Sequence, residues 1–170
     1  MPGPCTDRWN SPCRPPAADA RSELGPFDGD LICGTQNRSA IVTLFDRASP
    51  YCLLADRPVG HGAAEVLVAL VETFNRTDCR HARTLTWDQG REMARHADLK
   101  IATGLDVYFC DPHSPWQRGT NENTNGLLRQ YFPKGTDLTR HSADELAAVA
   151  HALNTRPRKT LDWKTPAEAL

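Results

Sequence analysis

The stretch Arg83–Cys110, RTLTWDQGREMARHADLKIATGLDVYFC, decides the fold. Its two ends, Arg83–Asp88 and Asp106–Cys110, are short apolar runs and are predicted to be strands. Between them, Arg91–Thr103 is predicted to be a helix that ends at Gly104. A strand, a helix and a strand in succession indicate parallel neighbours joined by a crossover. This part of the chain is therefore predicted to be α/β.

Upstream of this stretch, the sequence predicts three closely spaced strands and one helix. The strands are Asp30–Gly34, Ser39–Asp46 and Tyr51–Asp56, and the short connections between them suggest an antiparallel meander. In the segment 63–74, apolar residues recur at helical spacing. We therefore expect a mixed sheet of about five strands, three antiparallel and then parallel crossovers, flanked by helices.

The first residues of the chain differ in composition from the rest. Residues 1–26 hold six of the thirteen prolines and are predicted to be a linker or a disordered segment. Residues 27–170 are predicted to form one domain. After a polar loop at 111–121, helices are expected at about 122–132 and from a capping box, Ser142 with Glu145, onward.

Composition limits the function classes. The formal charge is −1, so the overall balance does not by itself indicate a nucleic-acid partner. No apolar run reaches the roughly 20 residues of a membrane span, and the first residues lack the apolar core of a signal peptide. We therefore expect a cytoplasmic protein without a membrane partner. Six scattered cysteines form no CxxC pair, which argues against structural zinc.

Two acidic residues occupy positions suited to chemistry. Asp88 follows a predicted strand, where open α/β sheets place ligand groups, although it could equally be the N-cap of the next helix. Glu122 shares one polar helix face with Asn125 and Arg129, which could also be an ordinary solvated surface. Carboxylates on rigid elements are the oxygen ligands that Mg²⁺ prefers, and two such ions about 4 Å apart assist phosphodiester chemistry.

A third carboxylate is less clearly marked. Asp30 lies near the start of the first predicted strand, and Asp28 and Asp46 compete with it. His113, in the loop that follows the last predicted strand, could act as a base or simply structure the loop. The residues alone leave these alternatives open.

Three long blocks carry a resemblance to a known family. They are TLTWDQGREMARH (84–96), VYFCDPHSPWQRGTNENTNGLLRQYFPKGTDL (107–138) and LNTRPRKTLDWKTPAEAL (153–170). Together they closely resemble the core of DDE transposases of the insertion sequence thirty family, over about Phe27–Leu170. Because long ordered blocks match, rather than isolated acids, the resemblance is specific.

The resemblance implies a ribonuclease-H-like fold similar to that of retroviral integrases, with a DDE triad that binds two Mg²⁺ ions, which Mn²⁺ could replace. The second Asp and the Glu of the triad match Asp88 and Glu122. The first Asp falls in a block that reads Phe27–Leu31 here, with two residues changed from the family pattern. Asp30 is the match, and Asp28 is the alternative.

The resemblance also implies a function and partners. We expect DNA cleavage and strand transfer on element ends and target DNA, by a homo-oligomer. Phosphate-positioning residues are predicted at Arg118, Asn121, Asn123, Asn125 and Arg129. Full family members carry an N-terminal helix-turn-helix region, and residues 1–26 do not resemble it, so a truncated core is expected. Two alternatives are an inactive remnant that only binds DNA or transposase subunits, and a ribonuclease-H-like nuclease with another substrate.

Overall fold

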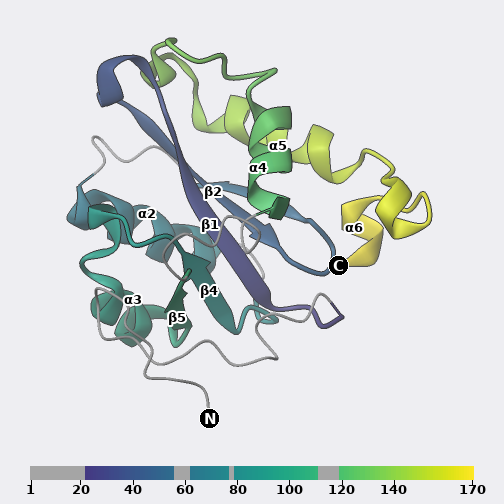
Figure 1. The fold of residues 1–170 in the computed structure, drawn as a ribbon, viewed down its shortest axis with the longest axis horizontal. Helices are drawn as coiled ribbons and strands as arrows, with labels where there is room; N and C mark the ends of the chain where they lie inside the picture. The colour runs from purple at the N-terminus through teal and green to yellow at the C-terminus, as the bar shows by residue number, and fades with distance from the viewer. Residues whose placement is uncertain (1–21, 56–61, 77–78, 111–118) are drawn as a thin grey trace.

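A mixed five-stranded sheet forms the centre of the protein (Figure 1). The computed structural model describes residues 22–55, 62–76, 79–110 and 119–170. The strand order is β3-β2-β1-β4-β5, with β1 antiparallel to β2, β2 antiparallel to β3, and β4 parallel to both β1 and β5. The strands are β1 (Pro26–Cys33), β2 (Ala40–Asp46), β3 (Cys52–Ala55), β4 (Thr84–Trp87) and β5 (Asp106–Phe109). The predicted meander and parallel crossovers are confirmed.

Helices cover both faces of this sheet. The α-helices are α2 (Ala63–Arg76), α3 (His96–Thr103), α4 (Gly119–Leu128), α5 (Ala143–Asn154) and α6 (Pro166–Ala169). Short 3₁₀ turns occur at Thr35–Asn37, Arg91–Met93, Leu138–Arg140 and Lys159–Leu161. In Figure 1, α2 and α3 lie on one side of the sheet, and α4 and α5 lie on the other. No helix in the described ranges is long and apolar enough to span a membrane.

Each face of the sheet has its own apolar core, because successive side chains of a strand point to opposite faces. In β1, Phe27 packs with the core under α2 and α3, whereas Ile32 packs with the core under α4 and α5. Asp28 and Asp30 are an even number of residues from Ile32 and therefore face α4 and α5. The alternation thus directs two carboxylates of a central strand to the same face.

Gly29 in β1 is required by close packing rather than by its backbone angles. A β-carbon at this position would lie 2.1 Å from the Trp87 ring, and the Trp87 side chain is only 1% exposed. The absence of a side chain at Gly29 therefore lets the indole pack closely against β1. This contact holds β1 and β4 in register on the face opposite the two acids.

Buried hydrogen bonds fix the edge strand and the turn beside it. The Asn154 amide at the end of α5 accepts from Cys52 N at 2.7 Å and donates to Cys52 O at 2.8 Å, so it pairs with the edge strand β3. The fully buried Asp46 carboxylate accepts hydrogen bonds from the backbone amides of Gly25, Ala48 and Ser49. These side chains satisfy backbone groups that a further strand would otherwise pair.

The structure corrects several predicted boundaries. β1 begins at Pro26, which the sequence assigned to the linker, and residues 1–21 lie outside the described residues. The helix predicted over 91–103 is a 3₁₀ turn followed by α3, and α4 begins at Gly119 rather than at 122. The capping box at Ser142 is confirmed, and Thr165 forms a second one with Glu168 that opens the unpredicted α6.

Candidate active site

Asp30 and Asp88 lie at corresponding positions of two adjacent parallel strands. The last paired residues of β1 and β4 are Asp28 and Thr86, and Asp30 and Asp88 each follow two residues later. Asp30 and Asp88 thus lie the same number of residues beyond the last β1–β4 pair. Both residues are half-buried. Asp30 lies within β1 and Asp88 directly follows β4, so two of the three predicted carboxylates belong to neighbouring parallel strands.

The two competing acids have other partners. Asp28 is buried, and its Oδ2 accepts from Nε of the equally buried Arg47 at 2.9 Å. Asp46 holds the turn after β2, as described above, and its side chain is fully buried. Asp30 differs from both because it is half-buried and reaches α4. These contacts favour Asp30 as the first member of the predicted triad.

Asn125 of α4 connects Asp30 to the helix. Its Nδ2 donates to Asp30 Oδ2 at 2.9 Å, and its Oδ1 lies 3.3 Å from the hydroxyl of Thr43 in β2. The same Thr43 hydroxyl lies 3.2 Å from Asp30 O, and Asp30 Oδ1 accepts from Leu31 N at 2.8 Å. One amide therefore joins β1, β2 and α4, and it fixes one oxygen of the Asp30 carboxylate.

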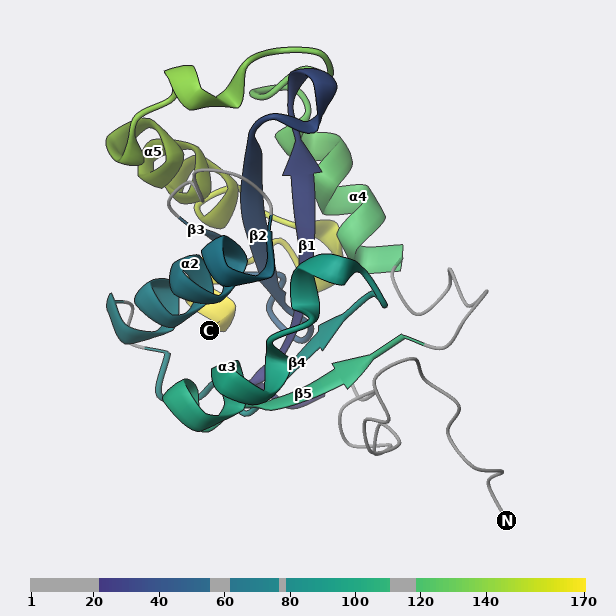
Figure 2. The same ribbon diagram turned by 90° about the vertical axis from the view of Figure 1, so that its left-hand side faces the viewer.

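Glu122 lies in the first turn of α4 and is exposed. It precedes Asn125 by three residues, so the two share one side of the helix. Figure 2 shows α4 alongside β1, which it contacts. Among the described residues, no three His, Cys, Asp or Glu side chains are close enough together to hold a metal ion. The triad is thus a prediction in which two carboxylates belong to neighbouring parallel strands and the third is exposed on the neighbouring helix.

Asp88 is not the N-cap of the helix that follows it. Its Oδ1 accepts from Gly90 N at 3.0 Å, which closes the turn after β4. The next 3₁₀ turn has Gly90 itself as its N-cap, with no side-chain cap. Gln89, within this turn, donates to Cys110 O at 3.1 Å and ties it to the end of β5. The alternative interpretation of Asp88 as a cap is therefore wrong, because the helix begins elsewhere.

The predicted phosphate-positioning residues have varied surroundings. Arg118 and the alternative base His113 lie outside the described residues. Asn121 is buried, so a phosphate could reach it only if the start of α4 moved, whereas Asn123 is exposed. Arg129 donates from both terminal nitrogens to Cys33 O, at 3.2 and 3.3 Å.

Among the described residues that are predicted to position phosphates, some therefore hold α4 in place and one is exposed to solvent. Asn125 and Arg129 hold α4 against β1, and Asn123 is the described member that faces solvent freely. Sequence reasoning missed Thr43 and Arg47, which contact the predicted site or its competitor. Only the period-2 alternation within β2 could have marked Thr43 as facing the same side as Asp30.

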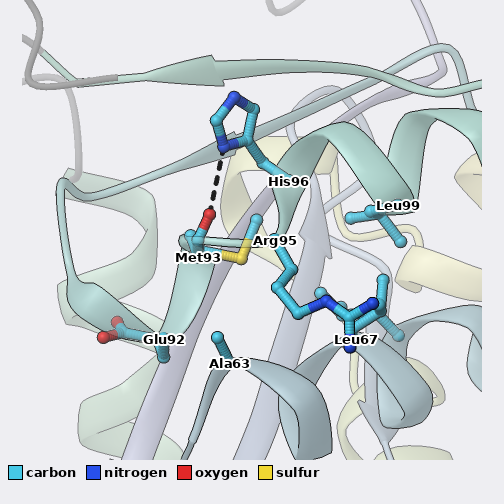
Figure 3. A pocket seen from close by; sticks show the side chains of 8 residues that line it. Ala63, Leu67, Glu92, Met93, Arg95, His96 and Leu99 are labelled. Carbon is cyan, nitrogen blue, oxygen red and sulfur yellow. Dashed lines mark hydrogen bonds between the residues drawn. The ribbon is translucent and has the colours of Figure 1, made fainter.

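A small hollow between α2 and α3 does not offer a ligand site. It encloses about 10 Å³, less than a single water molecule occupies in the liquid, and is lined mainly by Leu67, Met93 and Leu99. Figure 3 shows His96 above it, with Nδ1 3.2 Å from Met93 O. The ring of His96 also meets Phe109 edge to face, with the ring centroids 5.2 Å apart. This histidine fixes the turn before α3 and contributes to packing.

Known proteins resemble the chain closely in sequence. It is 54% identical over 157 residues to the transposase for insertion sequence element IS1086 of Cupriavidus metallidurans, which covers 92% of this chain and 46% of that protein. It is 52% identical over 152 residues to transposase InsI for IS30A of Escherichia coli strain K12, which covers 89% of this chain and 39% of that protein. Over most of its length the chain is therefore similar in sequence to transposases of insertion sequence elements.

A more distant relative also matches. The transposase for IS4351 of Bacteroides fragilis is 34% identical over 91% of this chain and 47% of its own length. The chain thus spans less than half the length of each of these three relatives. No family model matches it.

Solved structures show the fold of this chain. A chain of the simian T-cell lymphotropic virus intasome, in complex with a PP2A regulatory subunit, matches 84% of it with a TM-score of 0.65 and 18% identity. That match covers 52% of the intasome chain. The catalytic core domain of BIV integrase matches 84% of it and 90% of that chain, with a TM-score of 0.60 and 17% identity. The fold is the ribonuclease-H-like fold of integrase catalytic cores, as predicted.

Proposed function

We propose that this chain is the catalytic core of a transposase, which cleaves DNA at element ends and joins the freed ends to target DNA. The observation that carries the proposal is that Asp30 in β1 and Asp88 after β4 each follow the last β1–β4 pair by two residues, with Asp30 bonded to the helix that carries Glu122. Three transposases at 34% to 54% identity support it. The same relatives do not favour an inactive remnant.

The chemistry of the three carboxylates suits Mg²⁺ or Mn²⁺, because these hard cations take oxygen ligands. Asp30, Asp88 and Glu122 would hold the ions. Two bound divalent ions would supply Lewis-acid stabilisation of the attacking and leaving oxygens. Asp28 is paired with Arg47, which favours Asp30 over Asp28 as the ligand on this strand.

The other residues of the site orient the reacting groups. Asn125 holds one oxygen of Asp30 on the side of α4, so the carboxylate does not need to be ordered during the reaction. The closed turn at Asp88 fixes the second carboxylate in the same way. In the proposed reaction, water attacks the phosphodiester, a 3′ hydroxyl leaves, and that hydroxyl then attacks target DNA in line. No covalent protein intermediate is formed.

DNA is the proposed substrate and partner, and the active complex is proposed to be a homo-oligomer. Arg118 and Asn123 are proposed to position phosphates by contacts that carry no sequence information. The purified chain is expected to bind DNA weakly and in a salt-sensitive manner, with a Kd of roughly 10⁻⁴ to 10⁻⁶ M. Element ends and scrambled duplexes should compete equally, because phosphate contacts do not distinguish them.

A nicking and strand-transfer assay tests the proposal. The purified chain is incubated with a labelled duplex that carries an element end, with Mg²⁺, with Mn²⁺ or with EDTA. We expect metal-dependent products from the unchanged chain and none from Asp88→Asn. Asp144→Asn is the matched control, because it removes the same charge at an exposed position in the first turn of α5. Equal cleavage by Asp88→Asn and the unchanged chain would refute the assignment.

A further inference from the structure

A second hollow lies on the other flank of α4, between three parts of the chain. It encloses about 360 Å³ and is lined by the turn after β2, by Asn123 and its neighbour on α4, and by the segment that begins at Arg158. The C-terminal segment lies on the same side of the sheet as α4 (Figure 1). Its volume falls in the range of small-molecule sites, roughly 300 to 1,000 Å³. Its lining contains none of the predicted triad residues and does not belong to either apolar core.

Arg158 is held firmly at the wall of this hollow. Its backbone N–H donates to Lys164 O at 3.0 Å, and its carbonyl accepts from Trp163 N at 3.0 Å, so it closes the loop 158–164. Trp163, at the tip of the same loop, has a φ of 67° and is 69% exposed. The position of Arg158 is therefore fixed by the backbone of the loop.

Two nitrogens of the Arg158 guanidinium have no acceptor among the described residues. These nitrogens, Nε and Nη2, are shielded from solvent. Burial, and then the nearby charge of Arg156, lower the pKa of Arg158. Two shielded N–H donors without an acceptor are unfavourable, and a ligand that accepts from both would satisfy them.

The rest of the lining favours an anion. Arg47 also lines the hollow, but its charge is balanced by Asp28, to which it is bonded at 2.9 Å. Arg158 therefore leaves one uncompensated positive charge, and Asn123 and Thr160 add an amide and a hydroxyl. Nε–H and Nη2–H lie on one edge of the guanidinium fork, the edge that binds two oxygens of a carboxylate or a phosphate.

We propose that this hollow binds a backbone phosphate of DNA, with Arg158 as the principal ligand and Asn123 at its rim. The proposal rests on the proposed function for the choice of DNA. Asn123 directly follows Glu122, so their α-carbons are about 3.8 Å apart. The hollow and the proposed catalytic carboxylate thus occupy neighbouring sides of one helical turn. A strand bound at the triad could therefore place a neighbouring phosphate at Arg158.

Binding of DNA at several salt concentrations tests the proposal. Arg158→Gln is compared with Arg156→Gln, which removes the same charge two residues away at an exposed position outside the hollow. Fluorescence anisotropy with a short duplex gives the slope of log K against log salt. We expect Arg158→Gln to lower the magnitude of the slope by about one, the loss of one phosphate contact. Arg156→Gln should change it much less.

Thermal melting with inorganic phosphate gives an independent measurement. Phosphate should raise the Tm of the unchanged chain and of Arg156→Gln, but not that of Arg158→Gln. In phosphate-free buffer, Arg158→Gln should melt no lower than the unchanged chain, because an uncompensated buried charge is removed. If Arg158→Gln fails to fold, Asn123→Asp tests the same point. It keeps Arg158, adds a negative charge at the rim, and should abolish stabilisation by phosphate.

The outcomes separate this proposal from the proposed function. If the unchanged chain nicks DNA but Arg158→Gln keeps its full salt slope, the phosphate site is wrong and the catalytic proposal stands. If Arg158→Gln loses the slope while no variant ever cleaves DNA, the phosphate site stands and the catalytic proposal fails. Equal loss of slope in Arg156→Gln and Arg158→Gln would overturn the site, because general charge would then explain both. Stabilisation by phosphate with unchanged DNA binding would overturn the choice of DNA.

Discussion

Replacing Asn125 by alanine should loosen α4 from the sheet, because one amide joins three elements. The variant loses the 2.9 Å bond to Asp30 and the 3.3 Å contact with Thr43. A hydrogen bond to a charged group contributes about 1.5 to 3 kcal/mol and a neutral one about 0.5 to 1.5 kcal/mol. Because the site is half-buried, the low ends of these ranges apply, and the expected loss is about 2 kcal/mol.

A loss of this size is measurable by thermal melting. For a domain of this length, about 1 kcal/mol shifts Tm by roughly 2 to 4 °C, so Asn125→Ala should melt about 4 to 8 °C lower. Asn123→Ala is the matched control, because Asn123 is exposed on the same helix and the gain in helix propensity is common to both variants. If both variants melt at the same temperature, the hydrogen bond between Asn125 and Asp30 does not stabilise the attachment of α4 to β1.

A second variant links this contact to the charge at the site. Asn125→Asp places a carboxylate beside Asp30, and the two like charges raise the pKa of the pair in the folded state. Stability relative to the unchanged chain should therefore fall as pH rises above the unfolded pKa of about 3.9. Added Mg²⁺ should restore part of the Tm at neutral pH. A loss of stability that is independent of pH would contradict the placement of Asp30.

Three further predictions follow from particular contacts. Gly29→Ala should destabilise the fold by about 1 to 3 kcal/mol in urea unfolding, because the new methyl group displaces the buried Trp87 ring; an unchanged midpoint would mean that the ring moves freely. Asn154→Ala should cost about 2 to 4 kcal/mol, since both backbone groups of Cys52 lose their partner, and hydrogen exchange at Cys52 N should accelerate. Glu122→Gln should leave Tm within about 2 °C in metal-free buffer, because the side chain is exposed, while cleavage is lost; a large fall in Tm would make Glu122 structural.

Much of the candidate site could be predicted from order along the chain. The apolar runs before Asp88 and around Asp30 predicted that both acidic residues belong to strands. The long matching blocks then assigned both to the triad of the family that the chain resembles. The spacing of residues along the chain could not decide whether Asp28 or Asp30 is the first member of the triad. Both residues face the same side of β1, and only the distant Arg47 shows which one already has a counter-charge.

The sequence by itself determined the order of strands and helices, the mixed pairing and the two faces of the sheet. These depend on local periodicity and on short connections, which each segment carries in its own residues. Only the tertiary structure decided where Asn125 donates, why Gly29 has no side chain, and that two Arg158 nitrogens beside a hollow have no acceptor in the described part of the chain. Each of these depends on groups that are distant in the chain, such as Asn125 and Asp30, 95 residues apart. Packing brings such groups together, and no local pattern records which of them will meet.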